Sequence, residues 1–204
     1  MDSIIVHGCY DQDTFTTLRH LGIKKLGFDL RVTSTQFIKT RDLSYFMDQL
    51  HDEKAYFVFE DETPAVIDSY LDILKKHDDK IILEFRDNKN YRFYHGLKRD
   101  FVWMFRLDSD WRGILSCKNL KGVILPLEHK EFYRQSLELW SMIEEFQIEV
   151  YLHSKNSSEL RSHQEHGILM SYDLGAEVEN SYRSVNQQNL KNLKIWDPYA
   201  HSSR

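Results

Sequence analysis

Residues suited to acid–base chemistry or metal binding stand at or near the ends of short apolar runs in this chain. The set consists of His7, Asp29, Glu84, Arg86, Glu128, His153 and Asp173. Histidines and carboxylates that meet at one place transfer protons near neutral pH or hold a divalent ion such as Zn²⁺ or Mn²⁺. No close ligand motif such as HxH or HExxH accompanies them. A solvated rim, or a salt-linked polar cluster with Arg86 and Arg106, is therefore the simpler interpretation.

Eight runs of strand type hold or precede these residues, and an amphipathic stretch of helical period follows each run. The runs cover residues 4–6, 26–30, 56–59, 81–85, 101–105, 123–125, 149–152 and 168–172. They start roughly 20 to 30 residues apart, the length of a strand, a loop, a helix and a second loop. Residues 81–83 and 123–125 are apolar throughout, as helix-covered strands of a parallel sheet are. The pattern predicts an α/β fold, a single (βα)8 TIM barrel of eight parallel strands.

The predicted barrel spans residues 1–196, and residues 197–204 are expected to form a flexible C-terminal tail. Capping signals place helix starts near Asp11 or Asp13, after Asp42, and at Thr63-Pro64. Further helices are expected over residues 89–97, 109–116, 130–146, 157–166 and 186–193. The carboxyl ends of barrel strands form one mouth, where the active sites of this fold lie. The histidines and carboxylates named above should therefore meet there.

Composition narrows the function classes. The 204 residues include 27 Lys plus Arg against 32 Asp plus Glu, a net charge of −5, with no basic cluster for nucleic acid. No apolar run approaches the roughly 20 residues that span a bilayer, and the N-terminus lacks signal-peptide features. Cys9 and Cys117 form neither a disulfide framework nor a zinc motif. We expect a cytoplasmic monomer or homodimer without nucleic-acid or membrane partners and without a cofactor.

Several segments resemble phosphoribosylanthranilate isomerase, and the similarity runs nearly end to end. Residues 5–8, IVHG, correspond to the family's K-I-C-G, and residues 26–28 and 33–38, LGF and TSTQFI, to its G-F-x-F and S-x-R-Y-I. Residues 56–64, YFVFEDETP, are similar to V-G-V-F-V-N-x-x-P, and residues 174–177, LGAE, to D-V-S-S-G-V-E. The resemblance implies a compact (βα)8 barrel that, in the family, catalyses an Amadori rearrangement in tryptophan synthesis.

The resemblance also implies that the catalytic groups have changed. The family's general base is the cysteine of K-I-C-G, and His7 stands there. A histidine can still move a proton, because its unperturbed pKa lies near 6.5. The family's general acid is the aspartate of an L-L-D motif, and Pro126 stands at that point, which has no proton to donate. Glu128, two residues on, or Asp173 would have to take its place.

The substrate-binding motifs are altered as well. The family's carboxylate-binding arginine is replaced by Gln36, which lacks the charge-assisted fork of a guanidinium. The family binds phosphate on glycines after strands seven and eight, where this chain has His153-Ser154-Lys155-Asn156 and Asp173-Leu174-Gly175. An anionic Asp173 beside a phosphate dianion would repel it. The residues expected to contact a ligand are Ser34, Gln36, Arg86, His153, Ser154, Lys155 and Gly175.

Three functions follow from these residues. The first is a catalytically degenerate homologue, a pseudoenzyme with a binding or scaffold role and a small anionic ligand at the barrel mouth. The second is an active isomerase with His7 as base and Glu128 or Asp173 as acid. The third is a metal-dependent lyase or hydrolase that uses the mouth histidines and carboxylates.

Overall fold

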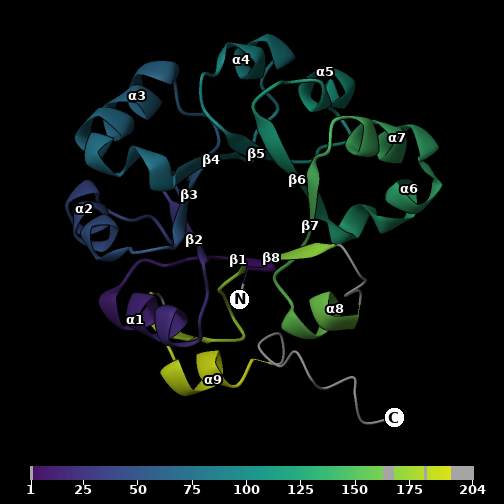
Figure 1. The fold of residues 1–204 in the computed structure, drawn as a ribbon. Helices are drawn as coiled ribbons and strands as arrows, with labels where there is room; N and C mark the ends of the chain where they lie inside the picture. Colours follow the sequence, from purple (N-terminus) through teal and green to yellow (C-terminus); the bar gives the residue numbers. More distant parts are fainter. Residues whose placement is uncertain (1, 163–167, 182, 194–204) are drawn as a thin grey trace.

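The computed structural model describes residues 2–162, 168–181 and 183–193. Eight parallel strands pair in chain order and β8 closes on β1, so the sheet is a complete barrel (Figure 1). The strands are β1 Ile4–His7, β2 Lys25–Asp29, β3 Lys54–Phe59, β4 Ile81–Phe85, β5 Phe101–Met104, β6 Leu120–Pro126, β7 Glu149–Ser154 and β8 Leu169–Asp173. The predicted (βα)8 barrel is confirmed, because each expected apolar run overlaps one of these strands.

Helices surround the barrel and connect successive strands (Figure 1). They are α1 Gln12–His20, α2 Thr40–Gln49, α3 Pro64–Ile73, α4 Tyr91–Gly96, α5 Trp111–Leu115, α6 Lys130–Gln135, α7 Leu137–Glu145 and α8 Ser157–Ser162, followed by α9 Gln187–Lys191. Asp11 caps α1, its Oδ1 accepting a hydrogen bond of 2.9 Å from Thr14 N. Pro64 is the first residue of α3, as predicted, although the Thr63 side chain makes no capping hydrogen bond.

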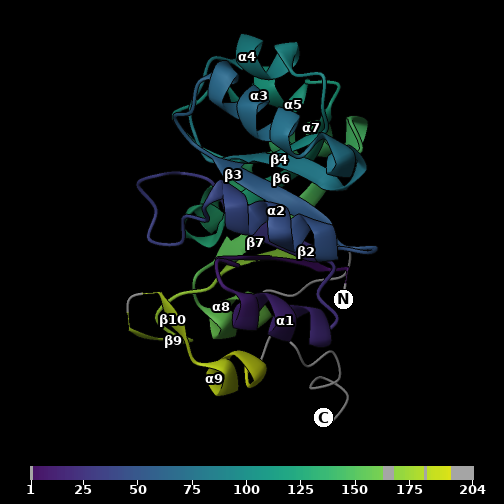
Figure 2. The same cartoon turned by 90° about the vertical axis from the view of Figure 1, so that its left-hand side faces the viewer.

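The helix predicted over residues 130–146 is divided in two. Ser136 ends α6 and begins α7, where its Oγ accepts a hydrogen bond of 3.3 Å from Leu139 N. A serine side chain competes with the helical backbone for such bonds, which explains the break. The short hairpin of β9 Glu179–Ser181 and β10 Ser184–Val185, near α9 in Figure 2, was not predicted. Residues 163–166 of one expected helix and the expected tail 197–204 lie outside the described residues.

Apolar side chains fill two regions. The larger core lies between the barrel wall and the helices and includes Phe28, Phe57 and Trp103. The barrel interior is filled by a smaller set, namely Ile5, Tyr56, Val102, Ile124 and Tyr151. At the amino end of the strands, Lys25 Nζ donates a hydrogen bond of 2.6 Å to Tyr151 Oη. The interior is therefore packed below the level at which the polar residues of the mouth begin.

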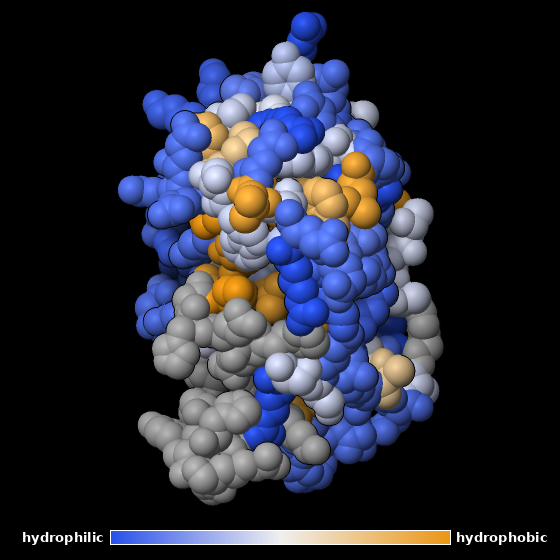
Figure 3. All heavy atoms as spheres, turned by 90° about the vertical axis from the view of Figure 1, so that its right-hand side faces the viewer, coloured by the Kyte–Doolittle hydropathy of each residue, from blue (hydrophilic) through white to orange (hydrophobic). Residues whose placement is uncertain are grey.

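The outer surface is mostly hydrophilic. On the face that carries α6, α7 and α8, apolar residues form only small groups among polar ones (Figure 3). Leu137 and Phe146, at the two ends of α7, are the large apolar residues of that helix region that lie exposed. Scattered apolar residues of this kind are normal for a folded surface. Within the described ranges, no helix combines the length and the apolar character needed to cross a membrane.

Candidate functional site

Strand register gathers polar side chains at the carboxyl end of the barrel. His7 of β1 lies opposite Asp173 of β8, and Ser171 of β8 lies opposite His153 of β7. Glu84 joins them from β4, with its Oε2 3.5 Å from His7 Nε2. Side chains alternate between the two faces of a strand, so residues two apart on β8 share the inner face. These five residues form a polar layer directly above the apolar interior.

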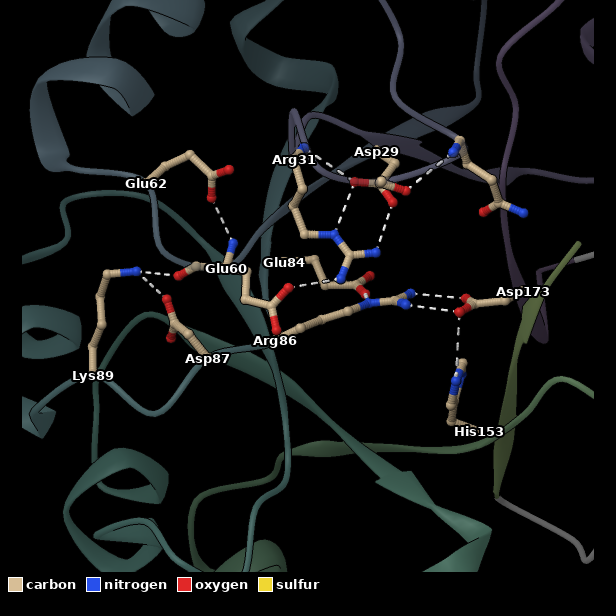
Figure 4. A network of polar contacts seen from close by, with 12 residues as sticks. Asp29, Arg31, Glu60, Glu62, Glu84, Arg86, Asp87, Lys89, His153 and Asp173 are labelled. Atoms are coloured by element: carbon tan, nitrogen blue, oxygen red, sulfur yellow. Dashed lines mark hydrogen bonds and ion pairs between the residues drawn. The ribbon is translucent and has the colours of Figure 1, made fainter. Parts of the chain in front are cut away.

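Arg86, the first residue after β4, lies at the centre of this layer. Its Nε donates to Glu84 Oε1 at 2.8 Å. Its Nη1 and Nη2 donate to the two oxygens of Asp173 at 2.8 and 2.9 Å, a two-pronged contact across the mouth (Figure 4). Only 8% of Arg86 is exposed. A planar guanidinium suits this arrangement, since it presents fixed donors to two carboxylates at once.

A second ion-pair group lies beside the first. Asp29, at the end of β2, accepts hydrogen bonds from Arg31 Nε at 2.9 Å and Nη2 at 2.7 Å. Arg31 Nη1 donates to Glu60, which follows β3, at 3.0 Å (Figure 4). Lys89 reaches the same corner and bonds to Asp87 and to the Glu60 carbonyl. The loops after β2, β3 and β4 are thus connected by the ion pair of Arg31 with Glu60 and by the hydrogen bond from Lys89 to the Glu60 carbonyl.

The two histidines of the layer are joined through a serine. His7 Nε2 lies 3.0 Å from Ser171 Oγ, and His153 Nδ1 lies 3.1 Å from the same atom. His153 Nε2 points toward Asp173 Oδ2 at 3.7 Å (Figure 4). The other side of the His7 ring rests on Gly27, where a Cβ atom would be 2.2 Å from His7 Nδ1. Glycine at this position is what allows a histidine to stand at the end of β1.

Burial and neighbouring charge set the protonation of these groups. Burial lowers the pKa of His7 well below its usual range, and the positive charge of Arg86 adds to this effect. Burial also lowers the pKa of His153, to about 4, against the opposing effect of Asp173. Both imidazoles are therefore neutral at physiological pH.

The pKa values of the two buried carboxylates, Glu84 and Asp173, are shifted in opposite directions. Burial raises the pKa of Glu84 to about 7, although Arg86 opposes the shift. Burial acts on Asp173 in the same sense, but the charges of Arg86 and His153 and the hydrogen bonds from Arg86 outweigh it and hold the pKa well below its usual range. Asp173 is therefore an anion at neutral pH, while Glu84 exchanges its proton near pH 7.

A cavity of about 540 Å³ opens above this layer. The residues lining it are Arg31, Glu60, Arg86, Met104, Arg106, Pro126, Leu127, Glu128, His153, Ser154, Lys155, Glu159 and Asp173. Four of these residues have cationic side chains and four have anionic ones, and His153 is the one histidine among the lining residues. His7 is 2% exposed and does not line the cavity. A ligand in the cavity would therefore meet His153 and not His7.

Three other predicted site residues line this cavity, namely Ser154, Lys155 and Glu128. Ser154 donates a hydrogen bond of 2.6 Å to Glu159. Lys155 and Glu128 line the cavity with exposed side chains, and Glu128 lies 3.5 Å from His129.

The other three predicted ligand residues, Ser34, Gln36 and Gly175, do not line this cavity. Ser34 Oγ accepts a hydrogen bond from Gln36 N at 3.1 Å. The Gln36 side chain donates to the Leu174 carbonyl and lies against Gly8, so it links the loop after β2 to the loop after β8. Gly175 begins a turn in that loop, with its carbonyl accepting hydrogen bonds from Val178 N and Glu179 N.

Two further residues of the site were not predicted from the sequence. Ser171 was missed. It stands two residues before Asp173 on β8, so the alternation of side chains along a strand indicates that both point into the barrel. Glu177 was missed as well. Its two carboxylate oxygens accept from Ser157 N, at 3.3 and 3.1 Å, and its Oε2 accepts from Tyr172 Oη at 2.8 Å. An acidic side chain thus covers the start of α8, and no local pattern shows this pairing across 20 residues.

Metal binding receives no geometric support. Across residues 2–162, 168–181 and 183–193, no three or more His, Cys, Asp or Glu side chains are grouped as metal ligands. The carboxylates of Asp173 and Glu84 instead bind the guanidinium of Arg86. Of the interpretations drawn from the sequence, a salt-linked polar cluster centred on Arg86 describes the layer best. Arg106 lies apart from it and pairs with Asp108 at 3.2 Å.

The fold and the site define a (βα)8 barrel whose mouth holds a buried network of paired charges. Its fold is that of the phosphoribosylanthranilate isomerases. The isomerase from Thermotoga maritima, as monomers generated from the dimer, superimposes with a TM-score of 0.69 at 13% identity, covering 94% of this chain and 95% of that one. The enzyme from Thermus thermophilus gives a TM-score of 0.67 at 15% identity, covering 94% and 96%.

Other barrels share the architecture. An HpcH/HpaI aldolase/citrate lyase family protein from Burkholderia cenocepacia gives a TM-score of 0.61 at 9% identity, covering 83% of this chain and 86% of that one. The sequence matches no protein-family profile and no curated protein sequence. The structural likenesses confirm the fold that the sequence motifs implied, and function has to be argued from the site.

Proposed function

We propose that this chain is a phosphoribosylanthranilate-isomerase-like barrel that has lost the isomerase reaction and serves as a pseudoenzyme that binds a small anionic ligand at its mouth. The observation that carries the proposal is the burial of His7. This histidine stands where the family has its base, but it is 2% exposed and does not line the cavity, whereas Arg86, Asp173 and His153 do. A base must come within hydrogen-bond reach of the proton that it removes.

The candidate acids support the same proposal. Pro126, at the position of the family's aspartate, lines the cavity and has no proton to give. Asp173 is ionised through its contact with Arg86, so it has no proton to donate at neutral pH. Glu128 lines the cavity, but its side chain is 75% exposed and lies beside His129. A general acid needs a proton near the operating pH and a fixed position, and none of these residues combines the two.

The place of the family's phosphate also differs. In that family, backbone N–H groups after strands seven and eight receive the phosphate. Here the backbone N–H of Ser157, the first residue of α8, donates a hydrogen bond to the carboxylate of Glu177, in the loop after β8. A phosphate brought to the same amide would meet this negative charge. The repulsion that the sequence assigned to Asp173 is thus better assigned to Glu177, because Arg86 neutralises Asp173.

The proposed ligand is small and anionic because the unburied cations of the cavity are Lys155 and Arg106. Lys155 has an exposed side chain beside His153, and the guanidinium of Arg106 is 42% exposed. Arg31 and Arg86 are less exposed and are bound to carboxylates within the mouth, whereas Arg106 contacts only the exposed carboxylate of Asp108 among the contacts named above. Calorimetric titration with inorganic phosphate and with malonate tests this role. We expect weak binding that Lys155→Ala reduces several-fold and that Lys98→Ala, outside the cavity, leaves unchanged; no binding of either probe would contradict the role.

The competing proposal is an active isomerase with His7 as base, which the barrel similarity favours. Purified protein assayed with phosphoribosylanthranilate separates the two. We expect turnover no higher than that of the His7→Ala variant, and no growth of a strain that lacks the isomerase. Turnover that His7→Ala abolishes would overturn the pseudoenzyme proposal.

A metal-dependent lyase or hydrolase is the third possibility drawn from the sequence. Elemental analysis of the purified protein, with and without added Zn²⁺ or Mn²⁺, tests it directly. We expect less than stoichiometric metal, because Arg86 already binds the carboxylates that would serve as ligands. A cytoplasmic location remains part of the proposal and rests on the cysteine usage of the chain. A monomeric or homodimeric state is part of the proposal as well.

A further inference from the structure

Ser171 connects two histidines that do not bond to each other directly. The centroids of the His7 and His153 rings are 6.4 Å apart, and the Ser171 hydroxyl lies between them, 3.0 Å from one ring nitrogen and 3.1 Å from the other. Ser171 has no exposed surface, and His7 and His153 are 2% and 8% exposed. No bulk water therefore competes for these hydrogen bonds, and the partners of the three side chains come from the chain itself.

One hydroxyl carries one proton, so two arrangements let Ser171 donate to one neutral ring and accept from the other. If both rings donated to Ser171, its own O–H would have no acceptor on either ring. In the first, His7 Nε2–H donates to Ser171, and Ser171 donates to His153 Nδ1. In the second, both bonds run the other way. The first arrangement gives His153 the tautomer with its proton on Nε2, and the second gives it the tautomer with its proton on Nδ1.

The neighbouring carboxylates decide between the two. In the first arrangement, His153 Nε2–H faces the anionic Asp173 Oδ2 at 3.7 Å, and His7 Nε2–H faces Glu84 Oε2 at 3.5 Å. In the second, both carboxylates would face nitrogen lone pairs, and the lone pair of His153 Nε2 would be bare. The second arrangement would also place a buried N–H at His7 Nδ1, which has no hydrogen-bond partner. Coulomb attraction therefore favours the first arrangement, most clearly above the pKa of Glu84.

We propose that Ser171 is a positioning residue that fixes the tautomer of His153, so that Nε2–H is presented as a hydrogen-bond donor at the mouth cavity. The 3.7 Å separation between His153 Nε2 and Asp173 Oδ2 exceeds hydrogen-bond length, so this N–H can still donate a hydrogen bond to an oxygen atom of a ligand. A ligand that binds to this donor must carry an acceptor oxygen, as a carboxylate, a phosphate or a carbonyl group does. The statement about the ligand rests on the proposed binding function, whereas the tautomer does not.

Long-range proton–nitrogen correlation spectra of the ¹⁵N-histidine-labelled protein at pH 8 test the inference. His7→Gln and His153→Gln variants assign the two rings. We expect both rings in the Nε2–H form in the wild type. In Ser171→Ala the two tautomers of His153 should both be populated, and Ser171→Thr, which keeps the hydroxyl, should restore the single form. Ser154→Ala removes a serine hydroxyl adjacent to His153 in the chain and should change nothing, because that hydroxyl bonds to Glu159.

A wild-type His153 with its proton on Nδ1 would overturn the inference, even if the Ser171 variants failed to fold. So would a Ser171→Ala spectrum identical to that of the wild type. Titration with inorganic phosphate or malonate should then shift the His153 Nε2 resonance. If the spectra show the expected tautomers but neither anion shifts this resonance, the role of Ser171 is supported and the anionic ligand is contradicted. Failure of the tautomer inference and failure of the binding proposal are therefore distinguishable.

Discussion

Replacing Arg86 by methionine tests the central contact of the mouth. Arg86 donates three hydrogen bonds of 2.8, 2.8 and 2.9 Å to Glu84 and Asp173, and all three residues are buried. Methionine is close in length and apolar, so it fills much of the same space without the charge. The substitution leaves two buried carboxylates without their cation.

The expected loss follows from that imbalance. Removing one partner of a buried ion pair typically costs about 3 to 5 kcal/mol, because the remaining charge stays desolvated. Two carboxylates lose their partner in Arg86→Met, so we expect a loss in the upper half of that range at pH 8. At pH 5 the loss should be smaller. Without Arg86, the pKa of Asp173 loses the largest effect that lowers it and burial shifts it upward, so both carboxylates can bind protons and lose their charge.

Urea unfolding followed by tryptophan fluorescence measures the loss at both pH values. Arg112→Met is the matched control, because Arg112 also makes a two-pronged contact, with Glu138, but both side chains are more than half exposed. We expect the control to leave the urea midpoint nearly unchanged, since water screens exposed ion pairs.

A domain of ordinary stability, about 5 to 15 kcal/mol, is close to unfolding after such a loss. The triple variant Glu84→Gln, Arg86→Met, Asp173→Asn therefore completes the test. It removes all three charges together and should recover most of the stability. A loss below about 1 kcal/mol in Arg86→Met at pH 8, or a triple variant as unstable as the single one, would refute the reasoning.

Three further predictions concern the same layer. Gly27→Ala should cost at least about 1 to 3 kcal/mol, because its Cβ would lie 2.2 Å from His7 Nδ1 and 2.9 Å from His7 Cα. Adding His7→Ala removes the ring but not the backbone contact, so it should cancel part of the loss, and fully additive losses in a double-mutant cycle would place the His7 ring elsewhere. Burial raises the pKa of Glu84 to about 7 in the folded state, so its contribution to stability falls as pH rises from about 4.3 to 7. Glu84→Gln should therefore gain stability relative to the wild type between pH 5 and pH 8, and a constant difference in urea midpoints would contradict this. Burial lowers the pKa of His153 to about 4, so its contribution is present above about pH 6.5 and is lost as pH falls toward 4; a His153→Gln variant whose acid sensitivity between these values equals that of the wild type would show that His153 is not buried in neutral form.

The fold was predictable from the sequence because it depends on short-range patterns. A run such as 81–85 is apolar enough to be a strand by itself, and Pro64 marks the start of a helix without reference to the rest of the chain. The break at Ser136 was not predicted, because an amphipathic pattern continues through it and the competing side-chain bond is visible only in the structure.

The residues of the site were predictable by type but not by partner. The sequence placed Arg86, His153 and Asp173 at the mouth, since all three follow or end a strand. It did not show that Arg86 reaches across the barrel to a carboxylate 87 positions away in the chain. Such a pairing depends on which strand ends face each other in the closed barrel, and that is fixed by the register of all eight strands together.

The pairing of charges within the mouth limits what the site can bind. An anion that bound to Arg86 would have to displace Asp173 and leave that carboxylate buried and unpaired, which costs several kcal/mol. A ligand is therefore restricted to donors outside this network, namely the side chains of Lys155 and Arg106 and the proposed Nε2–H of His153. Two of these groups, those of His153 and Lys155, lie two positions apart at the end of β7, so the loop after β7, and not His7, is where a change of ligand specificity would arise.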